Sequence, residues 1–120
     1  MSIELKTTIV PSPRVIDAAS AKQLIDTGGT TAIDVRTKSE IDASGCLSGA
    51  REIDFSAPDF AEKIAALPRN EMYLIYCQSG IRGFRTGLLM EKFGFVHVFI
   101  LAGGMNAWLR AGLSIRHEAE

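Results

Sequence analysis

The stretch that most constrains the fold is a short apolar run that ends in a cysteine and a tight polar loop. Residues 72–76 read Met-Tyr-Leu-Ile-Tyr, a pattern that predicts a buried strand. Cys77 follows, and the loop Gln-Ser-Gly-Ile-Arg at 78–82 leads into a helix predicted over residues 83–93. This order places a thiol at the carboxyl end of a strand, where free N–H groups and the positive end of a helix dipole meet.

A thiolate is stabilised in such a place, so we interpret Cys77 as a nucleophile inside an anion cradle. Arg82 adds positive charge at the helix entrance, and Arg85, one turn further, is predicted to lie on the surface. A cysteine at a strand end is more often a small buried apolar residue. Such a residue requires neither the glycine-containing loop nor the arginine, so the pattern favours a chemical role.

The whole chain alternates predicted strands with predicted helices. Strands are expected at residues 14–16, 31–35, 51–55, 72–76 and 96–101. Helices are expected at residues 18–26, 37–43, 83–93 and 105–111. A further helix is expected to start within residues 56–59 and to stop at Pro68. This alternation predicts an α/β fold with a mostly parallel central sheet and helices on both faces. Ligands bind such sheets at the carboxyl ends of the strands, where Asp34, Arg36, Cys77 and residues 102–104 are expected.

Local signals make further predictions about individual helices. Asp17 and Thr37 are expected to cap the helices that follow them. Residues 56–59, Ser-Ala-Pro-Asp, resemble a capping box with proline in the first turn. Near-helical spacing predicts that one face of the helix carries an apolar row, formed by Phe84, Leu88 and Phe93.

Length and charge limit the classes of function. The 120 residues fit one domain, residues 1–120, with a lead-in at 1–13 whose prolines prevent a regular helix. The formal net charge of -1 gives no global field that would favour nucleic acid or an anionic membrane. No apolar run approaches the roughly 20 residues of a membrane span, and the first residues do not resemble a secretory signal.

The cysteine count favours reduced thiols. Cys46 and Cys77 are too few for a disulfide scaffold, so both are expected to be reduced in a cytoplasmic protein. They cannot form a zinc site alone, and His97 and His117 show no ligand spacing with them. We therefore expect no metal site.

Several segments together resemble the single-domain rhodanese family of sulfurtransferases. They are Ile33-Asp34-Val35-Arg36 with Glu40, Gly49-Ala50, the run from Tyr76 to Arg82, and the run from Leu101 to Trp108. They occur in the order and spacing of the family over residues 14–113. The resemblance implies the rhodanese-like three-layer fold. The chain departs from the family at Cys46, where histidine is usual, and at Ile41 and Gly83.

The resemblance also implies a double displacement with no cofactor. The Cys77 thiolate would take the outer sulfur of a small anionic donor such as thiosulfate, and a thiol or cyanide would remove it from the persulfide. Loop N–H groups and the Arg82 side chain would hold the donor. The substrate-binding residues are then Gln78, Ser79, Gly80, Ile81 and Arg82. Asp34, Arg36 and Glu40 are expected to support the loop.

Other functions are compatible with the same residues. The chain would also serve as a non-catalytic module or carrier that exchanges sulfur with a protein donor or acceptor. A phosphatase or arsenate reductase is less well supported, because four residues separate Cys77 from Arg82 and the related phosphatases carry five. Cys46 would resolve a persulfide on Cys77 only if it lay within disulfide reach.

Overall fold

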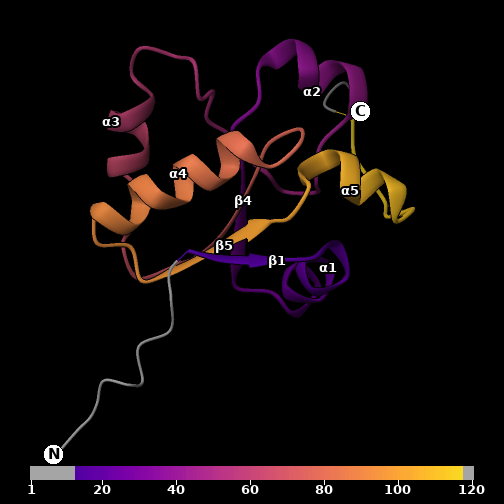
Figure 1. Ribbon diagram of the computed structural model, residues 1–120, viewed down its shortest axis with the longest axis horizontal. Helices are drawn as coiled ribbons and strands as arrows, with labels where there is room; N and C mark the ends of the chain where they lie inside the picture. The colour runs from indigo at the N-terminus through magenta and orange to yellow at the C-terminus, as the bar shows by residue number, and fades with distance from the viewer. Residues whose placement is uncertain (1–12, 118–120) are drawn as a thin grey trace, which may run out of the picture.

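The computed structural model describes residues 13–117, in which strands and helices alternate along the chain (Figure 1). The strands are β1 (Arg14–Ile16), β2 (Thr30–Asp34), β3 (Arg51–Glu52), β4 (Met72–Tyr76) and β5 (His97–Leu101). The helices are α1 (Ala18–Thr27), α2 (Lys38–Ser44), α3 (Phe60–Ala65), α4 (Ile81–Lys92) and α5 (Gly104–Arg110). The lead-in predicted at 1–13 lies outside the described residues, apart from Pro13. No helix within 13–117 has the length and apolar character that crossing a bilayer requires.

The strands form one sheet in the order β1-β5-β4-β2-β3, and every pair in it is parallel. The prediction of an α/β fold with a mostly parallel sheet is therefore confirmed. Because the strands run the same way, their carboxyl ends meet at one edge. Asp34 pairs in register with Tyr76, so the residues that leave β2 and β4 start side by side.

The side chains of β4 alternate between the two faces of the sheet, as the period of a strand requires. Tyr73 and Ile75 belong to a buried cluster with residues of α3 and α4. Leu74 and Tyr76 belong to a second cluster with residues of α1 and α5. Figure 1 shows these helix pairs on different sides of the strands. Both faces are covered, which explains why β4 is apolar throughout.

Helix α4 packs on the sheet mainly through small residues, and two members of the predicted apolar row are exposed instead. Gly83, Gly87 and Met90 are buried, whereas Phe84 is 43% exposed and Leu88 is 40% exposed. A Cβ atom on Gly87 would lie 2.5 Å from Cδ1 of Ile100, so a larger residue there would collide with β5. The glycine face takes the inward position and turns the large side chains outward. Phe93 alone of the predicted row is partly buried against the core.

Two predicted helix caps are confirmed. The carboxylate of Asp17 accepts a hydrogen bond from the N–H of Ser20 at 2.9 Å. Thr37 and Glu40 form a reciprocal capping box, in which each side chain accepts from the other's backbone N–H. These short-range signals act within one helical turn, so they are readable without knowledge of the tertiary structure.

The predicted cap at residues 56–59 is wrong. Helix α3 begins at Phe60, and its N-cap residue makes no side-chain cap. The carboxylate of Asp54 instead accepts hydrogen bonds from the N–H and hydroxyl of Ser56, at 2.8 and 2.7 Å. This turn occupies the serine and also ends the extended segment, so β3 stops at Glu52 rather than continuing to Phe55.

Candidate active site

Cys77 lies between the end of β4 and the first turn of α4, and only 1% of it is exposed. Its Sγ accepts hydrogen bonds from the backbone N–H groups of Gly80 at 3.0 Å and Gly83 at 3.3 Å. Gly80 has a φ of 118°, in the left-handed region that favours glycine. The sulfur therefore faces two backbone donors at a helix N-terminus, an arrangement that stabilises negative charge.

The source of these donors differs in part from expectation. The sequence predicted N–H groups from residues 78–82, yet within residues 13–117 those that reach Sγ belong to Gly80 and Gly83. Gly83 was missed because α4 begins at Ile81, two residues earlier than predicted. No side chain is involved in this bond, so the identity of residue 83 carries no signal for it; only the true start of α4 would have revealed it.

The carbonyl side of the loop is held by the first turn of α5. The N–H of Met105 donates to the carbonyl of Cys77 at 2.9 Å, and the N–H of Asn106 donates to that of Gln78 at 3.0 Å. A Cβ atom on Gly104 would lie 2.4 Å from the Cys77 carbonyl oxygen, a distance that no side chain tolerates. The glycine pair after β5 thus allows α5 to lie against the loop. The sequence predicts residues 102–104 and Cys77 at the same edge of the sheet, but it does not predict a contact between α5 and the loop.

Gln78 acts as a bridge. Its Oε1 accepts from Nη1 of Arg36 at 3.0 Å, and its Nε2 donates to Oδ1 of Asn106 at 2.7 Å. Gln78 is predicted to bind substrate, and its side chain joins two elements that flank the loop. Ser79 and Ile81, also predicted for substrate binding, are exposed, and Ile81 is 65% exposed.

Asp34 and Arg36 form a buried ion pair beneath the loop. Both side chains are fully buried, and Nε and Nη2 of Arg36 donate to the two carboxylate oxygens at 2.9 and 2.6 Å. Arg36 also donates to the carbonyl of Gly45 at 2.7 Å and the hydroxyl of Ser44 at 2.8 Å. Burial lowers the pKa of Arg36, but hydrogen bonds and charge from Asp34 raise it overall. Arg36 therefore stays charged, and it ties the exit of β2 to the loop through Gln78.

Glu40 and Arg82 form a second, partly exposed pair. Nη1 and Nη2 of Arg82 donate to the two carboxylate oxygens of Glu40, both at 2.8 Å. Hydrogen bonding from Arg82 lowers the pKa of Glu40 from 4.5 to about 2. The same bond raises the pKa of Arg82. The guanidinium predicted to hold an anionic donor is thus engaged by a carboxylate, which offsets its charge.

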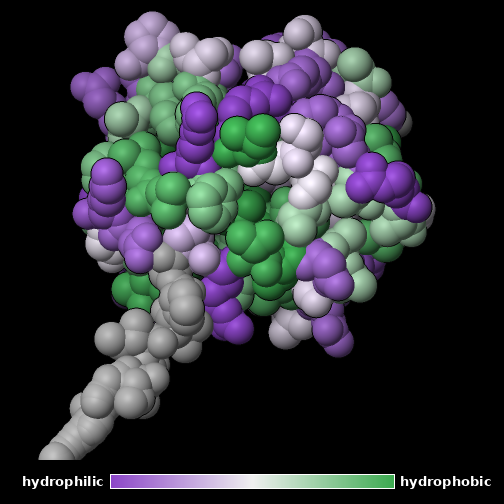
Figure 2. All heavy atoms as spheres, viewed as in Figure 1, coloured by the Kyte–Doolittle hydropathy of each residue, from purple (hydrophilic) through white to green (hydrophobic). Residues whose placement is uncertain are grey.

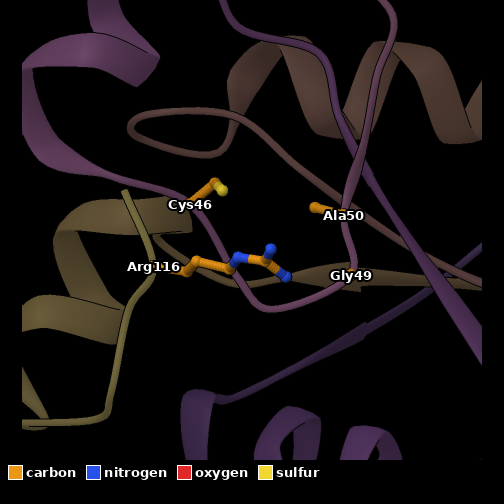
Figure 3. Close-up of a pocket in the computed structure, with 4 residues that line it drawn as sticks. All are labelled: Cys46, Gly49, Ala50 and Arg116. Atoms are coloured by element: carbon orange, nitrogen blue, oxygen red, sulfur yellow. The ribbon is translucent and has the colours of Figure 1, made fainter. Parts of the chain in front are cut away.

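Cys46 lies on the segment between α2 and β3, and it is 6% exposed. It lines a hollow of about 340 Å³ together with Gly49, Ala50 and Arg116 (Figure 3). The backbone of Cys46 pairs with that of Arg116, which closes one side of the hollow. The preceding carbonyl, that of Gly45, binds Arg36. Neither Cys46 nor Cys77 forms a disulfide, so the two sulfurs are not joined.

A family profile described as "Rhodanese-like domain" matches residues 17–111, which include β2, the Cys77 loop and α5. The chain belongs to this family. The match confirms the resemblance to rhodanese that the four sequence segments suggest. This rhodanese-like chain is also 33% identical over 101 residues to "Sulfurtransferase" of Allochromatium vinosum, covering 83% of the chain and 92% of that protein.

Other relatives and solved structures agree on the fold. The chain is 30% identical to "Protein HIGH ARSENIC CONTENT 1, mitochondrial" of Arabidopsis thaliana, covering 92% of the chain and 70% of that protein. The structure superposes on the crystal structure of a rhodanese-related protein from Thermoplasma volcanium with a TM-score of 0.74 and 26% identity. That alignment covers 85% of this chain and 96% of the other. The three-layer rhodanese fold is therefore shown.

Proposed function

We propose that this rhodanese-like protein is a sulfurtransferase that holds a sulfane sulfur on Cys77 as a persulfide. The observation that carries the proposal is the pair of N–H donors, from Gly80 and Gly83, directed at Sγ. Preorganised donors of this kind favour the ionised sulfur both before attack and when Cys77 leaves again. Relatives named sulfurtransferase support the same reaction class.

The first half of the proposed reaction loads the cysteine. The Cys77 thiolate attacks the outer sulfur of a donor such as thiosulfate, forming an S–S bond to Sγ. The S–S bond inside the donor breaks, and sulfite leaves with the electron pair. In the second half, cyanide or a thiolate attacks the sulfane sulfur, and Cys77 leaves as a thiolate toward the two N–H donors. Two simpler steps replace one, which predicts ping-pong kinetics.

Arg82 is proposed to contact the anionic end of a donor while it remains paired with Glu40. Its guanidinium has five N–H donors, and the pair with Glu40 uses one on each of Nη1 and Nη2. The remaining N–H groups are compatible with a contact to a sulfonate oxygen. The other loop residues, from Gln78 to Ile81, are proposed to shape the cradle through their backbone.

The compartment is part of the proposal. Two cysteines outside any disulfide, one of them the proposed nucleophile, support a role in the reducing cytoplasm. Sulfur donors and acceptors that occur there, including small thiols and protein thiols, are the proposed partners.

A donor assay with a matched cysteine control tests the proposal. The wild type, incubated with thiosulfate and cyanide, is expected to produce thiocyanate and to gain one sulfur atom by intact-mass spectrometry after thiosulfate alone. Cys77→Ser is expected to lose both signals, because no nucleophile is left. Cys46→Ser, at the other buried thiol, is expected to keep both.

The results separate the alternatives. A stable gain of sulfur without thiocyanate formation would favour a carrier over an enzyme. Hydrolysis of an aryl phosphate that disappears in Cys77→Ser would favour a phosphatase. Equal thiocyanate formation by the wild type and Cys77→Ser would refute the proposal.

A further inference from the structure

Helix α4 presents a row of large apolar side chains to solvent. Ile81 is 65% exposed, Phe84 is 43% exposed and Leu88 is 40% exposed. Their spacing of three and four residues places them on one face of the helix. We call these three residues the α4 stripe. Figure 2 shows hydrophobic residues at the surface over the position that α4 occupies in Figure 1.

The stripe does not contribute to the packed core. The buried residues of α4 are Gly83, Thr86, Gly87 and Met90, so the helix is held to the sheet without the stripe. A contiguous apolar row left at the surface of a globular domain commonly marks a contact with another molecule. Folding alone gives no reason for it.

The stripe starts at the active site. Ile81 directly follows Gly80, whose N–H donates to the Cys77 sulfur. The second donor, Gly83, belongs to the same first turn of α4. A molecule that covers the stripe therefore touches the loop that holds the proposed nucleophile.

The charge beside the stripe indicates what kind of molecule fits it. Arg85 is exposed next to Phe84 and makes no salt bridge with any residue of the described range 13–117. The charge of Arg82, in contrast, is offset by Glu40. A partner would match this surface by combining apolar side chains with a carboxylate.

A second copy of this chain fits less well. In a two-fold symmetric contact the same patch meets itself, so each stripe and its Arg85 would face the other stripe and its Arg85. Two positive charges, neither of them in a salt bridge within residues 13–117, would then approach each other at the interface, which opposes association.

We propose that the α4 stripe and Arg85 dock a protein segment that carries a reactive cysteine flanked by apolar and acidic side chains. The inference rests on the proposed sulfur transfer and names its partner as a protein thiol. The partner's thiolate attacks the sulfane sulfur of the Cys77 persulfide and forms a new S–S bond. The bond between Cys77 Sγ and that sulfur breaks, Cys77 leaves as a thiolate, and the partner cysteine carries the persulfide. No oxidant or reductant is consumed.

The test uses the full chain, loaded with sulfur by thiosulfate, and synthetic acceptors. One peptide contains a cysteine flanked by leucine, phenylalanine and glutamate, and a matched peptide replaces each glutamate by lysine. The acceptor 2-mercaptoethanol reports transfer to a small thiol. Initial rates of persulfide transfer are measured for the wild type and for Phe84→Ser, Leu88→Ser and Arg85→Glu. Val96→Ser is the matched control.

Val96 is a suitable control because it is 57% exposed and lies far from the loop. Its neighbour His97 pairs with Met72, the first residue of β4, whereas Cys77 follows the last. Five residues of strand separate the two edges by roughly 16 Å. The control thus removes an exposed apolar side chain without touching the proposed docking surface.

The wild type is expected to transfer sulfur faster to the acidic peptide than to the basic one. Phe84→Ser and Leu88→Ser should each lower the rate with the acidic peptide by about fivefold to tenfold, as for residues that matter at an interface. Arg85→Glu should reverse the peptide preference. None of these variants should change the rate with 2-mercaptoethanol, and Val96→Ser should match the wild type with every acceptor.

Two results would overturn the docking proposal. One is a set of stripe variants that transfer sulfur to the acidic peptide as fast as Val96→Ser does. The other is a dimer in sedimentation experiments that Phe84→Ser dissociates, which would assign the stripe to a second copy of the chain. Failure of the sulfurtransferase proposal itself is distinguishable, because the wild type would then gain no sulfur from thiosulfate before any acceptor is added.

Discussion

The charged residues around the Cys77 loop form two ion pairs. Asp34 with Arg36 is fully buried, whereas Glu40 with Arg82 is about 30% exposed on each side chain. The two pairs therefore differ in what they contribute. The buried pair connects segments of the chain, and the exposed pair positions the loop arginine while offsetting its charge.

Replacing Glu40 by glutamine should lower stability in a pH-dependent way. The folded-state pKa of Glu40 is about 2, below its ordinary 4.5, so the stabilisation exists above pH 4.5. It declines as the pH falls from 4.5 toward 2. Loss of this part-exposed, charge-assisted pair should reduce the unfolding free energy by about 1–2 kcal/mol at pH 7. Urea unfolding at pH 7 and at pH 2 measures the difference.

The exposed Glu62 on α3 offers a control for that prediction. Glu62→Gln removes a carboxylate with no salt bridge to the described part of the chain, so its effect should stay near zero at both pH values. A deficit in Glu40→Gln that is as large at pH 2 as at pH 7 would contradict the electrostatic explanation.

At the scale of elements, the loop after β4 depends on helices that approach it through glycine. The N–H of Gly83 in α4 donates to the sulfur, and the missing side chain of Gly104 lets α5 reach the loop carbonyls. Both contacts use backbone groups. Side-chain substitutions in these helices therefore act on the site mainly when they change how closely the backbones approach.

Gly104→Ala should be far more damaging than a comparable change elsewhere. Gly104 has a φ of 58°, and its new Cβ would lie 2.4 Å from the backbone oxygen of Cys77, which cannot move aside. We expect a loss of about 3 kcal/mol or more in unfolding free energy, together with loss of sulfur transfer.

Gly94→Ala is the matched control for the effect of a positive φ. Gly94 has a φ of 90°, and a Cβ atom added there would meet no other part of the described chain within 4 Å, so only backbone strain applies. That strain should cost about 1–2 kcal/mol and leave sulfur transfer unchanged. Similar stabilities for the two variants in chemical denaturation would show that the close approach of α5 does not matter.

At the scale of the whole molecule, Arg36 joins parts of the chain that are distant in sequence. Its guanidinium contacts the exit of β2 at Asp34, the end of α2 at Ser44, and the loop after β4 at Gln78. Gln78 continues the connection to α5 through Asn106. The carboxyl edge of the sheet is thus assembled around one buried cation.

Arg36→Met should destabilise the entire domain, because it leaves the Asp34 carboxylate buried without its partner. Breaking a buried pair in this way typically costs about 3–5 kcal/mol. Lys63→Met, which removes the exposed pair of Lys63 with Asp59, should change stability by less than about 0.5 kcal/mol. Thermal and urea unfolding compare the two variants, and equal effects would rule out a special role for the buried cation.

Much of the architecture was predictable from the sequence because its signals are local. The apolar run at 72–76, the caps at Asp17 and Thr37, and the alternation of elements each depend on neighbouring residues. These signals determine the α/β fold and the position of Cys77 at a strand exit. The glycine at position 80 likewise indicates a turn after the cysteine, and Gly80 has the positive φ that such a turn uses. The order of the strands follows from none of these signals.

Only the tertiary structure decided which groups meet. Arg82 and Glu40 are 42 residues apart, as are Gln78 and Arg36, and nothing in either local sequence specifies the pairing. The outward position of Phe84 and Leu88 was likewise decided by packing, because two glycines allow a closer helix–sheet contact than those side chains would. Local sequence determines whether each segment forms a helix, a strand or a turn. Which charged groups pair, and which helix faces stay exposed, depends on how the segments pack against one another in three dimensions.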